Sequence, residues 1–162
     1  MPPNKERRGR LQEWFDLVKK LRALSPRGRA RHTFRWLING LAYEMDEYPI
    51  EAQRGVKEIW EIRNDERSMP HPMHPHGFRF LVLGRTGSPE QISRLAVDES
   101  GRTVTDFGYK DTVLIWPGET VKLAVGFSHG FEGDQLYMFH CHILEHENVG
   151  MMLNVKVLFG EA

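Results

Sequence analysis

A short run near the C-terminus, in which the only cysteine lies between two histidines, constrains the fold more than any other feature of the sequence. Cys141 is flanked directly by His140 and His142. Successive side chains of a β-strand point to opposite faces, so in a strand the cysteine faces one way and both histidines face the other. The run therefore predicts a strand that contributes to two separate sites, one on each face of a sheet.

Two residues downstream of Cys141 extend this run into a set of metal ligands. His146 follows the cysteine by five positions and Met151 follows it by ten. A thiolate, two imidazoles and a weakly bound thioether form the ligand set of a blue-copper electron-transfer centre. A lone cysteine is more commonly a small buried hydrophobic residue, but the flanking histidines favour a copper site. One imidazole of the set has to come from another part of the chain.

A second histidine motif, HPMHPHG beginning at His71, supplies that imidazole and two more. We expect His71 to complete the site around Cys141. If residues 73–78 are extended, His74 and His76 share one face, and they can meet the histidines that flank the cysteine. The sequence thus predicts a copper site around the cysteine, a second site of four imidazoles, and a short covalent route between them.

Together the two motifs resemble the C-terminal copper-binding domain of the multicopper oxidases, the family of laccases, bilirubin oxidases and cuprous oxidases. Both motifs match in order and spacing, and the similarity extends from about Arg31 to the end of the chain. The resemblance implies copper as the cofactor and a cupredoxin fold. It implies that the ligands of the type 1, or blue, copper are His71, Cys141, His146 and Met151. It further implies a type 2 ligand at His74 and type 3 ligands at His76, His140 and His142.

Outside the two motifs, the sequence predicts an all-β domain. Seven short runs are rich in β-branched and aromatic residues and are separated by turn clusters such as Pro117-Gly118-Glu119. These predicted strands are Phe34–Ile38, Val56–Arg63, Phe78–Leu83, Val113–Trp116, Val121–Phe127, Leu136–His140 and Met152–Phe159. Seven or eight such strands form a Greek-key β-sandwich, which is the architecture of the cupredoxin fold that the resemblance implies.

The N-terminal part differs in charge from the rest of the chain. Residues 1–35 hold eleven Lys or Arg and three Asp or Glu, whereas the remainder holds eleven and nineteen. Apolar residues at helical spacing between Leu11 and Leu24 predict an amphipathic helix. We therefore divide the chain into a basic, helical extension and a cupredoxin domain, with the bounds 1–30 and 31–162.

A basic amphipathic helix has several uses. It could lie on a membrane surface, contact nucleic acid, or pack its apolar stripe against the acidic body or a neighbouring subunit. We expect packing, because amphipathic helices most often bury their apolar face within a protein. A nucleic-acid partner and a membrane are therefore not expected.

The chain carries only half of the histidines that the oxygen-reducing cluster of the resembled family requires. That trinuclear cluster takes eight histidines, four of them from an N-terminal cupredoxin domain. Six of the eight histidines of this chain belong to the two motifs, and the other two, His32 and His129, lie almost a hundred residues apart. One copy of the chain cannot close such a cluster.

Two hypotheses for the function follow, and they belong to different classes. In the first, copies assemble into a ring, with a trimer favoured because two-domain relatives form trimers. The shared histidines then make an oxidase that passes electrons from phenols or reduced metal ions to molecular oxygen. In the second, the protein is a blue-copper electron-transfer or copper-binding protein without oxidase activity. A third possibility is that the chain is a fragment of a longer oxidase.

Glu147, next to His146, is the candidate catalytic acid. The resemblance implies a role in delivering protons to the oxygen site, because the matching acid of bacterial relatives is thought to serve it and proton transfer needs a positioned acid. The common alternative for such a residue is a solvated loop carboxylate.

The sequence contains no recognisable targeting segment. Arg7-Arg8 is not followed by a continuous apolar run or a small-residue cleavage site. The sequence also has no stretch of about eighteen apolar residues, which is the length needed to span a bilayer as a helix. Members of the resembled family are usually periplasmic or secreted, so the location of this chain is left open.

Overall fold

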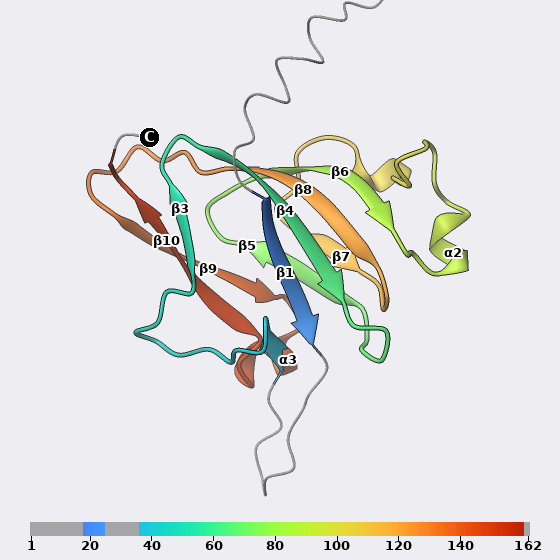
Figure 1. Cartoon of the computed structure of the whole chain (residues 1–162), viewed down its shortest axis with the longest axis horizontal. Coiled ribbons are helices and arrows are strands. Elements are labelled where there is room, and N and C mark those ends of the chain that lie inside the picture. Colours follow the sequence, from blue (N-terminus) through green and yellow to red (C-terminus); the bar gives the residue numbers. More distant parts are fainter. Residues whose placement is uncertain (1–17, 25–35, 161–162) are drawn as a thin grey trace, which may run out of the picture.

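The computed structural model describes residues 18–24 and 36–160, with side chains from residue 36 onwards (Figure 1). The strands of this described part form two five-stranded sheets. The first has the order β2-β1-β4-β8-β6 and contains β1 (Val18–Leu24), β2 (Leu37–Ile38), β4 (Lys57–Asn64), β6 (Phe80–Thr86) and β8 (Thr120–Gly126). The second has the order β3-β10-β9-β5-β7 and contains β3 (Ile50–Gln53), β5 (His71–Pro75), β7 (Val113–Ile115), β9 (Gln135–Cys141) and β10 (Met152–Leu158). Short helical segments are α2 (Glu90–Ser93), η1 (Val104–Asp106) and α3 (Leu144–Asn148).

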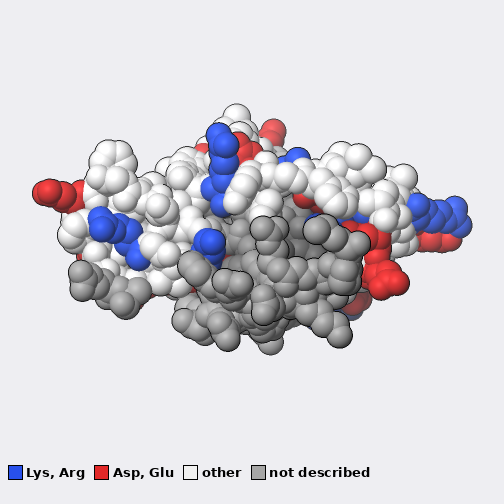
Figure 2. Space-filling model, turned by 90° about the horizontal axis from the view of Figure 1, so that it is seen from above, with Lys and Arg blue, Asp and Glu red and all other residues white. Residues whose placement is uncertain are grey.

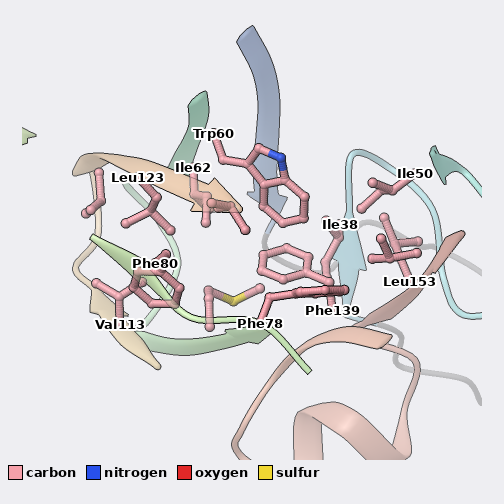
Figure 3. Close-up of a cluster of buried hydrophobic side chains, with 14 of the residues drawn as sticks. Ile38, Ile50, Trp60, Ile62, Phe78, Phe80, Val113, Leu123, Phe139 and Leu153 are labelled. Atoms are coloured by element: carbon pink, nitrogen blue, oxygen red, sulfur yellow. The ribbon is translucent and has the colours of Figure 1, made fainter. Parts of the chain in front are cut away.

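The two sheets pack face to face around an apolar core (Figure 3). Buried residues alternate with more exposed ones along β8, between Val121 and Val125, which is the pattern of a strand with one face in a core. The ring centroid of Trp60 in β4 lies 5.3 Å from that of Phe139 in β9. Phe139 is two residues before Cys141, so this packing fixes the inward face of the strand that carries the cysteine.

This architecture confirms the predicted all-β sandwich. Six of the predicted strands overlap β4, β6, β7, β8, β9 and β10. Of the predicted strand at Phe34–Ile38, the last two residues form β2, and residues 34–35 lie outside the described part. β3 is not among the predicted strands. Its four residues are too few to give a clear alternation, and it is defined instead by parallel pairing with β10.

The predicted N-terminal helix is wrong over Val18–Leu24, because these residues form strand β1. β1 pairs in parallel with β4, starting with Val18 opposite Ile59, so this part of the predicted extension is joined to the first sheet. Apolar residues in a short run can satisfy helical and strand spacing alike. Pairing with β4 decides between them, since the backbone N–H and C=O groups at the edge of β4 gain partners. Residues 11–17 of the predicted helix lie outside the described residues.

A buried ion cluster anchors the long connection between β6 and β7. Arg85 donates two hydrogen bonds of 2.8 Å to the carboxylate of Asp106 and one of 2.9 Å to Glu119, and all three side chains are almost completely buried. Burial acts to raise the pKa of Asp106, but the hydrogen bonds that it accepts outweigh burial and lower the pKa overall. The cluster therefore holds this connection beside β7, the strand that pairs with the first histidine motif.

The surface carries both signs of charge. On the face shown in Figure 2, basic and acidic side chains of the described residues are interspersed, without an extended patch of either sign among them. Within the described part of the chain, every helix is too short or too polar to cross a bilayer.

Candidate metal centres

Three buried side chains converge and form what we call the inner site, defined by His71, Cys141 and His146. The Sγ atom of Cys141 lies 3.5 Å from Nδ1 of His71 and 3.4 Å from Nδ1 of His146. The two Nδ1 atoms are 3.2 Å apart. The exposed fraction is 0% for His71 and Cys141 and 5% for His146. One sulfur and two ring nitrogens thus form a small, solvent-shielded triangle.

Antiparallel pairing of β5 with β9 brings the two histidine motifs together. Met73 lies opposite Cys141, and His74 lies opposite His140. The cysteine faces the core, whereas the paired histidines point to the outer face of the second sheet, as strand alternation requires. His71 begins β5 two residues before Met73, so its ring also faces the core beside the cysteine. The pairing therefore places one ligand set on each face of the sheet.

The segment after β9 returns the chain to the inner site. α3 carries His146, and Met151 follows just before β10. The N–H of Cys141 donates to the C=O of Met151 at 3.1 Å, and the N–H of Met151 donates to the C=O of His146 at 2.9 Å. Met151 is completely buried. Met151, the predicted thioether ligand, is thus tied through its backbone to two members of the inner site.

Two residues that the sequence did not single out contact the imidazoles of the inner site. The Oγ atom of Ser68 lies 2.7 Å from Nε2 of His71. The ring centroid of Trp36 lies 4.2 Å from that of His146 and 5.2 Å from that of His71. Trp36 is far from both motifs in sequence, and Ser68 resembles any polar turn residue, so neither gave a signal in the chain.

Burial keeps the inner site electrically neutral in the metal-free protein. Burial, followed by the nearby ring of His146, lowers the pKa of His71 to about 4. Burial also lowers the pKa of His146. Burial raises the pKa of the Cys141 thiol to about 11. At neutral pH both imidazoles therefore keep free electron pairs, and the thiol gives up its proton only when a cation takes that place.

Four histidines on the opposite face of the second sheet form what we call the outer site: His74, His76, His140 and His142. Ligand atoms of the first three lie within 4.8 Å of one another. Nε2 of His76 and Nε2 of His140 are 2.8 Å apart. The ring of His142 is 5.4 Å from those of His74 and His140, and His142 is exposed. The outer site is a compact cluster of imidazoles that is open to solvent on one side.

Neighbouring groups orient two rings of the outer site. Nδ1 of His74 lies 2.7 Å from the C=O of Asp111, so Nδ1–H donates there and Nε2 is free to bind a metal. Nδ1 of His140 lies 3.0 Å from the C=O of Cys141 and 3.4 Å from a carboxylate oxygen of Glu147. Burial is the largest of the effects that lower the pKa of His140. The partly exposed Glu147 is therefore the acidic side chain that we find beside the outer site.

The structure brings together seven of the eight predicted metal ligands, three in the inner site and four in the outer site, and hydrogen-bonds the backbone of the eighth, Met151, to two residues of the inner site. Of the two remaining histidines, His129 belongs to neither site, and its ring faces Phe131 at 6.3 Å. His32 lies outside the described residues.

The donor chemistry of both sites fits copper. Sulfur and neutral imidazole are the ligands that copper prefers, and an all-imidazole cluster also suits it. Hard cations such as Mg²⁺ and Ca²⁺ take oxygen ligands instead, and the ligand atoms of these two groups are nitrogen and sulfur. The described residues thus provide two groups whose ligand atoms suit a copper ion.

Two relatives of known sequence are a multicopper oxidase and a laccase, each several times the length of this chain. It is 38% identical over 124 residues to a multicopper oxidase of Staphylococcus aureus, covering 74% of this chain and 24% of that protein. It is 35% identical over 116 residues to a laccase of Haloferax volcanii, covering 72% of this chain and 18% of that protein. The chain therefore spans about a quarter or less of the length of these relatives.

A solved structure of a multicopper oxidase also resembles this chain. The crystal structure of a multicopper oxidase from the hyperthermophile Aquifex aeolicus matches with a TM-score of 0.68 and 36% identity, over 87% of this chain and 29% of that one. This likeness confirms the predicted cupredoxin-like sandwich. The model of the family described as multicopper oxidase matches residues 16–160. This chain belongs to the multicopper oxidase family, whose cofactor is copper.

Proposed function

We propose that the chain is a redox domain that binds type 1 copper in the inner site and contributes half of a type 2 and type 3 copper cluster through the outer site. The observation that carries this proposal is the placement of two convergent ligand sets on the two faces of a single pair of strands, β5 and β9. Membership of the family supports it independently.

In this proposal His71, Cys141, His146 and Met151 are the residues that would hold copper at the inner site. Bound copper would supply a one-electron acceptor and donor. The protein contributes the rest: burial excludes water from the ligands, and neutral imidazoles present their electron pairs toward the thiol. Because Cys141 is bonded directly to His140 and followed by His142, the two ligand sets are linked by the backbone of adjacent residues.

The outer site is proposed to be completed by further copies of the chain, with a trimer favoured. Four imidazoles face outward, and apolar side chains are exposed on the same side. Leu114 of β7 is one of these side chains, and it lies opposite Pro72 of β5. Leu114 follows Thr112 by two residues, and the hydroxyl of Thr112 is 3.1 Å from Nδ1 of His74. Leu114 borders a cavity of about 380 Å³ that Val104 also lines. Exposed apolar surface beside an open cluster suits contact with another subunit.

A completed cluster would make the protein an oxidase of the laccase type. A phenol or a reduced metal ion would donate single electrons at the inner site, and molecular oxygen would be reduced at the outer one. Glu147 is proposed to deliver protons, since its carboxylate is 3.4 Å from His140 and reaches solvent. Replacing Glu147 by Gln should slow oxygen reduction while leaving the type 1 spectrum intact. An unchanged rate would contradict this role.

The alternative is a blue-copper electron-transfer or copper-binding protein without oxidase activity. One observation favours it: His74, His76 and His140 of a single copy already place three ligand atoms within 4.8 Å. Such a group can hold one ion without any neighbour. In that case the outer site binds an isolated copper and no oxygen-reducing cluster forms.

The deciding experiment is oxygen uptake by the copper-loaded protein with an easily oxidised phenol, together with its molar mass in solution. Matched variants are Cys141→Ser in the inner site, His74→Ala in the outer site, and His129→Ala in neither. Uptake by an oligomer that is lost in the first two variants and kept in the third supports the oxidase. Blue colour in a monomer without uptake supports the electron-transfer alternative.

A further inference from the structure

The side chain of Ser68 contacts the ring nitrogen of His71 that does not face the other ligand atoms of the inner site. Its Oγ atom is 2.7 Å from Nε2 of His71, while Nδ1 of the same ring faces Cys141 at 3.5 Å and His146 at 3.2 Å. The imidazole is therefore engaged at both nitrogens, with the cysteine and the other histidine on one side and the serine on the other.

We propose that Ser68 is a positioning residue that selects the tautomer of His71 in which Nε2 carries the proton and Nδ1 presents its electron pair to the inner site. A neutral imidazole has one protonated and one free nitrogen, and the partner of the protonated nitrogen fixes which is which. In this arrangement Nε2–H donates to Ser68 Oγ. The ring is then ready to bind a metal before any metal arrives.

The turn that carries Ser68 is held rigidly enough to do this. Asn64, completely buried at the end of β4, donates from its side-chain amide to the C=O of Met69 at 2.8 Å and to the C=O of Ile115 at 3.1 Å. Ile115 is the residue opposite His71 in the pairing of β7 with β5. The same amide thus links the segment just after Ser68 to the strand beside His71.

Hydrogen bonds within the turn fix the serine itself. The N–H of Ser68 donates to the C=O of Asp65 at 3.1 Å, and the N–H of Arg67 donates to the side chain of Asp65 at 3.0 Å. The ring of Trp36 packs against the His71 ring in a T-shaped arrangement, with ring planes at 74°, and limits its rotation. The positions of Ser68 and of the His71 ring are therefore set by the fold, before any metal binds.

The inference rests on the proposed function in one respect, because it takes His71 to be a metal ligand. Its first test needs no metal. In metal-free protein labelled with ¹⁵N-histidine, long-range ¹H–¹⁵N NMR at pH 7.5 reports which nitrogen of His71 is protonated. We expect a single Nε2–H tautomer in the unchanged protein, a mixture in Ser68→Ala, and the single tautomer again in Ser68→Thr, which keeps a hydroxyl.

A second measurement connects the tautomer to metal binding. Titration with Co²⁺, followed by cobalt–thiolate absorption, reports the inner site alone because the outer site has no sulfur. Loss of a group that orients a metal ligand typically weakens affinity roughly 10- to 100-fold, so Ser68→Ala should bind Co²⁺ at least about tenfold more weakly and Ser68→Thr nearly as well as the unchanged protein.

Ser93→Ala is the matched control, since the hydroxyl of Ser93 donates to the C=O of Glu90 at 3.1 Å within its own helix. It should change neither readout. The proposal is overturned if His71 carries its proton on Nδ1 in the unchanged protein, or if Ser68→Ala keeps both the single tautomer and the affinity. Failure of the unchanged protein to bind any metal at Cys141 would instead contradict the proposed function, and the tautomer measurement distinguishes the two.

Discussion

The inner and outer sites are built from the same two strands, yet they differ in closure. In the inner site the ligand atoms of one copy converge in the core, and its rings are backed by Trp36 and Ser68. In the outer site four imidazoles gather on a sheet face that opens to solvent through His142. The comparison teaches that strand alternation can distribute potential ligands to both faces of a sheet, whereas packing decides which set is shielded from solvent and which stays open to it.

The largest expected effect is the complete loss of copper binding or absorption at one site while the other site keeps it. Cys141→Ser should abolish the thiolate-to-copper absorption, because serine cannot provide the sulfur donor, while copper bound by the outer site should persist. Conversely, a His74→Ala, His76→Ala double variant should keep the blue absorption and lose the outer copper. Visible absorption and copper content measure both. Blue absorption in Cys141→Ser would show that the inner site has been misassigned.

The next effect acts on the turn beside the outer site. Gly77, directly after His76, has φ of 76°, and a Cβ there would lie 2.5 Å from the ring of Tyr137. Positive φ costs a non-glycine residue about 1–3 kcal/mol, and the clash adds to it. Gly77→Ala should lower the free energy of unfolding by at least about that amount and weaken the outer site, with the inner site unchanged.

Gly133→Ala is the control for that variant. Gly133 has φ of 75° but open space where a Cβ would lie, so it shares the backbone cost without the clash. Urea denaturation and metal titration of both variants isolate the contact with Tyr137. Equal destabilisation of the two would mean that Tyr137 moves away freely.

A smaller effect concerns acid and belongs to the inner site. The pKa of His71 is about 4 in the folded protein and 6.5 for an ordinary histidine. Between these pH values the unfolded chain binds a proton at His71 that the folded chain does not bind. The contribution of neutral His71 to the free energy of unfolding is therefore complete above pH 6.5 and is lost as the pH falls toward 4. We expect the metal-free protein to lose on the order of 1–2 kcal/mol between pH 6.5 and pH 5 from this group.

Urea denaturation across this range measures the loss. His71→Asn removes the titrating ring and should flatten the pH dependence, although the burial-lowered pKa of His146 leaves some of it. An equally steep dependence in His71→Asn would assign the acid sensitivity to other groups.

The smallest effect is spectroscopic. Trp36 packs on both imidazoles of the inner site, so Trp36→Ala should broaden and shift the copper–thiolate absorption without abolishing it, and Trp36→Phe should shift it less. Trp116→Ala, in the cavity beside Arg85, is the control and should leave the spectrum unchanged. An unaltered spectrum in Trp36→Ala would mean that the rings are held by the metal and the backbone alone.

The two histidine motifs predicted which side chains meet in the inner site and which meet in the outer site, because spacing and strand alternation are local properties of a sequence. His140, Cys141 and His142 need only one strand to be sorted onto two faces. The partners of these ligands could not be predicted in this way. Trp36 and His146 are more than a hundred residues apart, and their contact depends on how the two sheets pack.

The same limit explains the error at the N-terminus. Val18–Leu24 contains apolar residues at spacings that fit a helix, and only pairing with the edge of β4 makes it a strand. Long-range pairing also defines β3, whose four residues alternate between apolar and polar but are too few to indicate a strand on their own. Ser68 was missed for a related reason: a serine in a turn becomes informative only when the ring beside it is known.

The two-faced strand also limits how such chains can change in length during evolution. Inserting or deleting one residue between Phe139 and His142 would exchange the faces, turning the thiol outward and an imidazole into the core. Residues 130–134, just before β9, are exposed, and a change in length there leaves the alternation intact. Homologous chains should therefore vary in length before β9 and keep a constant number of residues from Phe139 to His142.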